Sequence, residues 1–215
     1  MEEYQLDQER RTLIRISIAL AGRDADLLQG ALEEGARFGD PGEVEEVLLQ
    51  SYLFLGYPIA LNAFALWREA SGRGPEGESP DDWDSWRTRG EEVCRVVYGG
   101  QYDGLRRNVR SLHPDMERWM VAEGYGKVLG RPGLDLLTRE LCIAGLLVVL
   151  GAPRQLYSHL RGALNAGAPS AVVEQVLDMA CQELDAPEER EARAVWTRVQ
   201  SRVPGRELST IPDSR

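Results

Sequence analysis

The sequence RELCIAGLLVVLGAPRQLYSHLRGALNAG, residues 139–167, decides the fold because its pattern of alanine, leucine and glycine occurs twice in the chain. Its last part, Ala163-Leu164-Asn165-Ala166-Gly167, matches Ala31-Leu32-Glu33-Glu34-Gly35 near the N-terminus. Ordered matches of this kind are the signature of a repeat, so we predict a duplicated helical unit. Further matches follow in the same order: Val44-Glu45-Glu46-Val47-Leu48 with Val173-Glu174-Gln175-Val176-Leu177, Pro58 with Pro187, and Trp67 with Trp196.

The two copies differ at the residues that can do chemistry. His159 in the second copy corresponds to Leu27 in the first, and near the position of Glu140 the first copy offers only Arg11 and Thr12. We therefore expect the second copy to carry the active site and the first copy to support it. Two copies are fewer than a solenoid needs, so we expect two tandem repeats packed around a pseudo-twofold axis, as a pseudo-dimer.

Apolar residues recur at helical spacing, and no segment shows the sustained alternation of a strand. Pro41 and Pro169 mark the starts of helices, and Ser170 is expected to be the N-cap of the second. The sequence therefore predicts an all-α fold. The apolar positions that indicate the first helices are Leu13, Ile16, Leu20, Leu27, Leu28, Leu32, Val44, Val47, Leu48 and Phe54.

Composition divides the chain into four parts. Residues 1–70 form the first copy, which lacks the residues for chemistry. Residues 71–82, rich in glycine, serine, proline and glutamate, are typical of a flexible linker. Residues 83–203 form the second repeat with the candidate active site, and they open with an aromatic segment that wraps or precedes it. Residues 204–215 are polar and contain proline, so we expect a flexible tail.

The formal net charge of −10 argues against nucleic acid and anionic membrane surfaces as partners, since both require a basic surface. A small anionic organic substrate remains compatible, because a few arginines can reverse the field inside a pocket. The uncharged stretch from Leu141 to Pro153 is too short to span a bilayer and indicates a buried helix.

The N-terminal residues do not form a secretory signal, and the three cysteines are odd in number and widely spaced. This cysteine usage is typical of a reducing compartment, so we expect a cytoplasmic protein without disulfides. The chain contains only two histidines, far apart, and no cysteine cluster. Such a set supplies no metal ligands, and we expect no metal site.

Three motifs of the second copy carry a resemblance: Tyr125-Gly126-Lys127-Val128-Leu129-Gly130-Arg131-Pro132-Gly133-Leu134-Asp135, then Thr138-Arg139-Glu140-Leu141, then His159-Leu160-Arg161-Gly162-Ala163-Leu164-Asn165-Ala166-Gly167. They are similar to the carboxymuconolactone decarboxylase family, within the AhpD-like superfamily. The resemblance is fairly specific over residues 90–180 and weaker over residues 10–70. It implies an all-α fold of paired helices and a homo-oligomer, which for a tandem chain would be a trimer.

The superfamily also includes AhpD-like alkyl hydroperoxidases, whose chemistry needs a Cys-x-x-Cys pair just ahead of the histidine and a glutamate 19 residues before it. Glu140 precedes His159 by 19 residues, so that part of the frame is present. The two cysteine positions, however, are occupied by Ala152 and Gln155. Without thiols there is no dithiol chemistry, and peroxidase or oxidoreductase activity is disfavoured.

The decarboxylase members resemble this chain in having the glutamate and histidine without the cysteine pair, and they use no metal or organic cofactor. The resemblance therefore implies a cofactor-independent lyase that acts on a small carboxylated lactone or related acid. Such a reaction needs a cation for carboxylate, donors for a developing oxyanion and an acid that reprotonates carbon. The expected residues are His159 and Glu140 for proton transfer, Arg131 and Arg139 for carboxylate, and Tyr125 and Trp119 along the pocket.

A different class of function remains open at this stage, namely a non-catalytic oligomeric binding protein that retains only the fold. The discriminating feature is the pocket beside His159, either closed by apolar side chains or open and lined by arginine. The second copy also departs from the family after Cys181, where it reads Gln182-Glu183-Leu184-Asp185-Ala186-Pro187. Either the first half or a neighbouring subunit would then complete the pocket.

Overall fold

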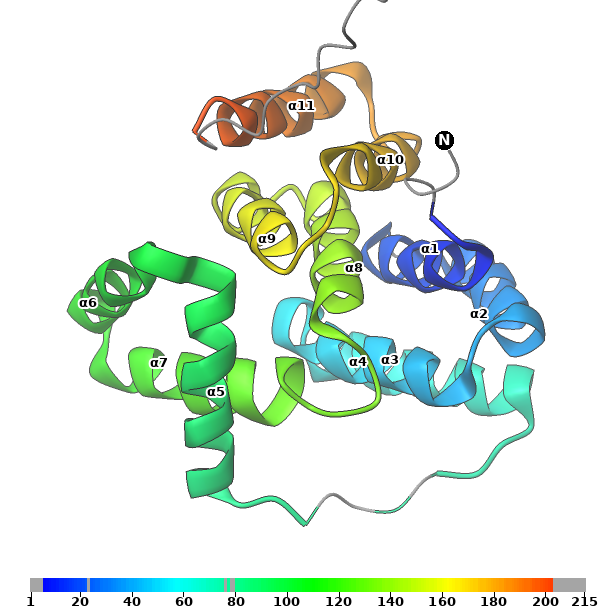
Figure 1. Ribbon diagram of the computed structural model, residues 1–215. Coiled ribbons are helices and arrows are strands. Elements are labelled where there is room, and N and C mark those ends of the chain that lie inside the picture. Colours follow the sequence, from blue (N-terminus) through cyan, green and yellow to red (C-terminus); the bar gives the residue numbers. More distant parts are fainter. Residues whose placement is uncertain (1–5, 23, 76, 78–79, 203–215) are drawn as a thin grey trace, which may run out of the picture.

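The computed structural model describes residues 6–22, 24–75, 77 and 80–202, and every regular element among them is a helix (Figure 1). The prediction of an all-α fold is therefore confirmed for the described residues. The helices of the first half are α1 (Gln8–Gly22), α2 (Ala25–Phe38), α3 (Pro41–Leu55) and α4 (Tyr57–Ser71).

The second half begins with a group of helices that we call the cover segment, residues 83–129. Its elements are α5 (Trp83–Tyr98), the 3-10 helix η2 (Gly99–Gln101), α6 (Tyr102–Leu112), α7 (Pro114–Trp119) and the π-helix η3 (Met120–Leu129). The helices that follow repeat the order of the first half: α8 (Leu136–Val149), α9 (Pro153–Asn165), α10 (Ser170–Cys181) and α11 (Ala186–Gln200).

Helices α1 and α8 begin in the same way. The carboxylate of Asp7 accepts a hydrogen bond from the backbone N of Arg10 at 2.8 Å, and that of Asp135 accepts one from the backbone N of Thr138 at 3.0 Å. Each aspartate thus satisfies a backbone N–H at the start of its helix. Aligning the helices on these caps places Thr12 of α1 at the position of Glu140 in α8.

Helices α1 and α8 also pack against each other near the centre of the molecule, so the equivalent helices of the two halves form their interface (Figure 1). Gly145 lies at this contact. A Cβ atom at Gly145 would lie 3.1 Å from Cγ1 of Ile18, closer than an ordinary van der Waals contact. The absence of a side chain at Gly145 therefore lets the two helices approach each other.

Equivalent hydrogen bonds in the two halves support the predicted duplication. The indole N–H of Trp67 on α4 donates to Glu45 on α3 at 3.2 Å. In the second half the indole N–H of Trp196 on α11 donates to Glu174 on α10 at 3.1 Å. The same residue types at matched positions thus join the third and fourth helices of each half.

The helix starts predicted at the two prolines differ in detail. Helix α3 begins at Pro41, and Asp40 caps it through the backbone N–H groups of Gly42 and Glu43. The expected N-cap role of Ser170 is wrong, because Pro169 occupies the N-cap position and Ser170 is already the first helical residue of α10. The extended backbone of Pro169, with φ of −62° and ψ of 143°, makes the turn into the helix.

The cover segment is held together by very close packing of α5 on η3. A Cβ atom at Gly90 of α5 would overlap the backbone carbonyl of Val121, and one at Gly126 of η3 would overlap that of Trp86. No other residue fits at these two positions without moving a backbone. Helix α5 also packs against α9, which carries His159, so the cover segment is positioned beside the candidate site.

The predicted linker corresponds to the connection between the end of α4 and the start of α5, which lie on opposite sides of the view in Figure 1. Its described residues, 72–75, 77 and 80–82, contain no helix or strand. The other linker residues, the first five residues of the chain and the predicted tail at 204–215 lie outside the described residues. The division into domains stays a prediction from the sequence.

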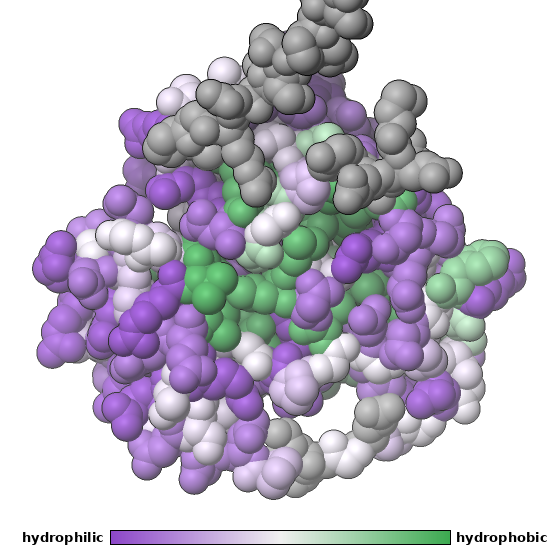
Figure 2. Space-filling model, in the orientation of Figure 1, coloured by the Kyte–Doolittle hydropathy of each residue, from purple (hydrophilic) through white to green (hydrophobic). Residues whose placement is uncertain are grey.

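Figure 2 shows hydrophobic residues gathered at the centre of one face, surrounded by hydrophilic residues. None of the helices in the described ranges has the length and apolar character needed to cross a bilayer. The described residues also contain no group of three or more histidine, cysteine, aspartate or glutamate side chains arranged to hold a metal ion.

Candidate active site

The predicted proton-transfer residues lie in direct contact. Glu140 stands in the first half of α8 and His159 in the middle of α9, and the histidine Nδ1 lies 2.8 Å from Glu140 Oε2. Glu140 is fully buried and His159 is 6% exposed. A carboxylate at this distance accepts the Nδ1–H proton, fixes the ring tautomer and leaves Nε2 to face outward from the pair.

Gly162, which the sequence reasoning did not single out, makes room for this pair. It follows His159 on α9 by about one turn, and a Cβ atom there would lie 2.6 Å from Glu140 Oε2 and 2.9 Å from Val97 Cγ1. A side chain at this position would push the carboxylate away from the imidazole. The second oxygen, Glu140 Oε1, is buried and has no hydrogen-bond partner among the described residues.

His159 opens onto a pocket of about 350 Å³, which we call the His159 pocket. One wall comes from the first half, where Leu53 and Phe54 end α3, and the Phe54 ring meets the imidazole edge-on with 5.6 Å between ring centroids. The other walls come from the cover segment. Within the described chain, the first half thus contributes a wall of the His159 pocket.

The two aromatic residues predicted along the pocket are both present. Trp119, at the end of α7, is 45% exposed at the rim, and Tyr125, on η3, is 4% exposed in the interior. Met116, Met120 and Leu129 make the remaining walls largely apolar, while Glu123 adds a carboxylate. A pocket of this size and lining suits a small organic molecule.

Tyr98 on α5 was missed by the sequence reasoning and pairs with Tyr125. Their hydroxyl oxygens lie 2.5 Å apart, and both side chains line the His159 pocket. Burial is the main reason why the pKa of each phenol is raised above its usual value, and the charge of Glu140 adds to the effect. Both hydroxyls therefore keep their protons at neutral pH.

One hydroxyl proton of the Tyr98–Tyr125 pair is not used in the hydrogen bond between them. Two neutral hydroxyls carry two protons, and only one of them can lie between the two oxygens. Neither Tyr98 nor Tyr125 has a second hydrogen-bond acceptor among the described residues. The remaining O–H is thus available to an acceptor on a molecule in the pocket.

Arg131 and Arg139, predicted to hold a substrate carboxylate, do not line the His159 pocket. Arg139 is fully buried and its Nη2 donates to Glu46 Oε2 at 2.7 Å, while Arg131 Nε donates to Glu46 Oε1 at 3.0 Å. Burial lowers the pKa of Arg139, and the hydrogen bond to Glu46 opposes that shift. Since Glu46 is on α3, both arginines serve as a bridge between the halves, which corrects their expected role.

The cysteines offer no reactive thiol pair. Cys94, Cys142 and Cys181 are all free and buried. Burial raises the pKa of the Cys142 thiol to about 12 and also raises that of the other two. Thiols that remain protonated at neutral pH are poor nucleophiles, which agrees with the missing Cys-x-x-Cys pair.

The fold and the site together define an all-α protein in which a buried glutamate–histidine pair faces a small apolar pocket. Residues 114–198, which include this pair, match the profile of the carboxymuconolactone decarboxylase family. This segment of the chain is therefore similar to the carboxymuconolactone decarboxylase family.

Two curated relatives are similar to this chain. A 4-carboxymuconolactone decarboxylase of Acinetobacter baylyi is 28% identical over 90 residues, which cover 41% of this chain and 67% of the relative. Peroxisomal protein 2 of Schizosaccharomyces pombe is 27% identical over 169 residues, which cover 73% of this chain and 77% of the relative. The second alignment is longer than the second half, so the likeness extends into the first.

Proposed function

We propose that this protein is a cofactor-independent decarboxylase that acts on a small carboxylated lactone or a related unsaturated acid. The single observation that carries the proposal is the buried Glu140–His159 pair, whose histidine lines the His159 pocket. A histidine that a carboxylate holds in one orientation can donate or accept a proton in a reaction. The match of residues 114–198 to the decarboxylase family supports the same reaction class.

In the proposed reaction the bond between the carboxyl carbon and the ring carbon breaks, and carbon dioxide leaves. The electron pair of that bond delocalises onto the lactone carbonyl, so the substrate is its own electron sink. The unpaired proton of the Tyr98–Tyr125 pair donates a hydrogen bond to the resulting oxyanion. Nε2 of protonated His159 then delivers a proton to carbon, and solvent protonates the histidine again.

The lining of the His159 pocket also bears on how the substrate carboxylate is held. Arginine and lysine are absent from the described lining, so His159 is the lining side chain that can carry a positive charge. The apolar walls formed by Leu53, Met120 and Leu129 desolvate a localised carboxylate more than a delocalised enolate. Replacing water by such a wall favours loss of carbon dioxide.

A non-catalytic binding protein is the second candidate. The observation in its favour is the same absence of arginine. The His159 pocket is accessible, but its described lining contains no arginine that would hold a substrate carboxylate. An AhpD-like peroxidase has no such support, since the cysteine positions are Ala152 and Gln155 and the thiols of the chain are buried.

Two assays on the purified full chain separate these candidates. The first follows release of carbon dioxide from 4-carboxymuconolactone, and the second follows thiol-dependent reduction of a peroxide. We expect turnover in the first assay only. Binding of the lactone without release of carbon dioxide would support the binding protein, and peroxide turnover would overturn the proposed reaction class.

A further inference from the structure

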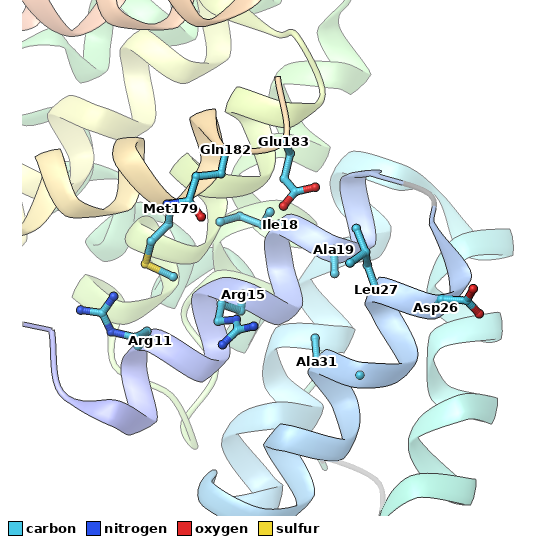
Figure 3. Close-up of a pocket in the computed structure, with 11 residues that line it drawn as sticks. Arg11, Arg15, Ile18, Ala19, Asp26, Leu27, Ala31, Met179, Gln182 and Glu183 are labelled. Atoms are coloured by element: carbon cyan, nitrogen blue, oxygen red, sulfur yellow. The ribbon is translucent and has the colours of Figure 1, made fainter. Parts of the chain in front are cut away.

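A second and larger cavity, of about 510 Å³, lies in the first half between α1, α2 and the end of α10 (Figure 3). We call it the first-half pocket. Figure 3 shows Arg11 and Arg15 at one end of it, on successive turns of α1, and Leu27 on α2 toward the other end. Gln182 and Glu183 lie across from them, at the end of α10.

The first-half pocket occupies the place that corresponds, in the repeat, to the His159 pocket. Leu27 is the counterpart of His159, and the matches that pair Trp67 with Trp196 also pair Gln182 with Leu53 and Glu183 with Phe54. All three counterparts line the first-half pocket. Each pocket thus combines the second helix of one half with the end of the third helix of the other.

The two pockets differ in what covers them. In the second half, α5 packs on α9 and η3 packs on α3, and His159 is only 6% exposed. In the described part of the chain, no such group of helices lies against α2 and α10, and Leu27 is 49% exposed. The first-half pocket is therefore open to solvent, and side chains of α1 form part of its wall.

The side chains of the first-half pocket define the kind of ligand that fits. Arg11 is half-buried and has no ion pair or hydrogen bond from its guanidinium among the described residues, whereas Arg15 pairs with Glu34 at 2.9 Å. A half-buried guanidinium without a partner suits a carboxylate. Ala19 and Leu27 provide an apolar surface in the middle.

The opposite side carries acceptors. The Glu183 carboxylate and the Gln182 amide face the cavity, and Asp26 lies at its far end. These carboxylates repel a second negative charge and accept hydrogen bonds from a hydroxyl or amino group. The pocket therefore suits a ligand with one carboxylate, an apolar body and a hydrogen-bond donor at the other end.

We propose that the first-half pocket is a binding site for a small monocarboxylate that carries a hydroxyl or amino group opposite its carboxylate. The ligand binds without chemical change, because Leu27 and Thr12 stand where the second half has His159 and Glu140. Thr12 is buried, and its hydroxyl donates to the backbone carbonyl of Gln8 instead of serving a ligand. Binding at this site does not depend on decarboxylation at His159.

Calorimetric titration of the full chain with 4-hydroxybenzoate tests this site, with benzoate and 4-hydroxybenzyl alcohol as matched probes. We expect 4-hydroxybenzoate to bind more tightly than either analogue, since each lacks one of the two polar groups. Arg11→Gln is expected to lower the affinity for 4-hydroxybenzoate roughly tenfold, because a charge-assisted contact is lost. Glu183→Gln should weaken the binding of 4-hydroxybenzoate, while the binding of benzoate should be unchanged or tighter.

Two control variants locate the binding. Arg107→Gln removes an exposed arginine on α6 and should leave all affinities unchanged. His159→Ala alters the other pocket and should retain the 4-hydroxybenzoate binding that Arg11→Gln weakens. Leu27→Trp, at an exposed position, should fill the cavity and abolish binding. Absence of binding below about 10 mM, unchanged binding in Arg11→Gln, or binding lost only in His159→Ala would each overturn the proposal.

Discussion

At the scale of single residues, the site depends on groups that place one carboxylate and one imidazole in contact. Glu140 and His159 come from neighbouring helices, and the resemblance to the family, whose glutamate precedes the histidine by 19 residues, was enough to predict the pair. Tyr98 and Gly162 were not predicted, because their roles depend on which faces of α5 and α9 meet. Arg139 was expected to hold a substrate carboxylate because a guanidinium matches carboxylate geometry. Its partner, Glu46, lies 93 residues away in the sequence, so their ion pair was not visible there.

The tyrosine pair gives a prediction at this scale. Because either hydroxyl can donate within the pair, Tyr98→Phe and Tyr125→Phe should each lower kcat, and the double variant should lower it by about a hundredfold. Tyr157→Phe is the matched control, since Tyr157 is a tyrosine of α9 outside the His159 pocket. Steady-state kinetics measures the effect, and a double variant with the wild-type kcat would exclude the pair as oxyanion donor.

Gly162 gives a second prediction at the scale of single residues. In Gly162→Ala the new methyl group displaces the Glu140 carboxylate, since its carbon would otherwise lie 2.6 Å from Oε2, which is too short for a carbon and an oxygen. We expect a loss of about 1–3 kcal/mol in the free energy of unfolding, from overpacking, and a lower kcat. Urea denaturation and kinetics measure the two effects. Retention of full activity would show that the carboxylate position does not matter.

At the scale of helices, the contact between α1 and α8 joins the two halves. Its closest point is Gly145, whereas Gly30, on α2, faces open space with no heavy atom within 4 Å of an added Cβ. Gly145→Leu should therefore lower the free energy of unfolding by about 1–3 kcal/mol or more, while Gly30→Leu changes it little. Denaturation curves of the two variants test this, and equal stability would mean that the halves do not depend on this contact.

The ion pairs of Glu46 join α3 to the segment before α8 and to α8 itself. Glu46→Gln leaves the fully buried Arg139 without its charged partner, so we expect a loss of about 3–5 kcal/mol in the free energy of unfolding. Glu34→Gln, which breaks the pair with the exposed Arg15, should cost less than about 1 kcal/mol. The reverse order in urea denaturation would contradict the bridging role of Glu46.

At the scale of the whole molecule, the predicted repeat accounts for two related pockets with different contents in one chain. The sequence predicted the all-α fold and the matched helices, because apolar spacing and the order of Pro58, Trp67 and their counterparts are visible in it. It did not predict that Phe54 would complete the His159 pocket. That contact follows from the packing of the halves, which pairs the end of α3 with α9.

The assembly of the chain also belongs to this scale and stays a prediction. The family resemblance implies a trimer of tandem chains, and the hydrophobic centre of the face in Figure 2 offers an apolar surface for contact between copies. For a chain of 24.0 kDa we expect a particle of about 72 kDa in light scattering after size-exclusion chromatography. A single species at the mass of one chain would contradict the expectation.

The central claim is that the second half carries the chemistry through His159. The most direct test is the initial rate of carbon dioxide release from 4-carboxymuconolactone by the wild type, His159→Ala and His113→Ala. His113, the N-cap of α7, is the other histidine of the chain and controls for loss of an imidazole. We predict a rate at least about a hundredfold lower in His159→Ala and unchanged in His113→Ala. Equal rates in all three proteins would contradict the claim.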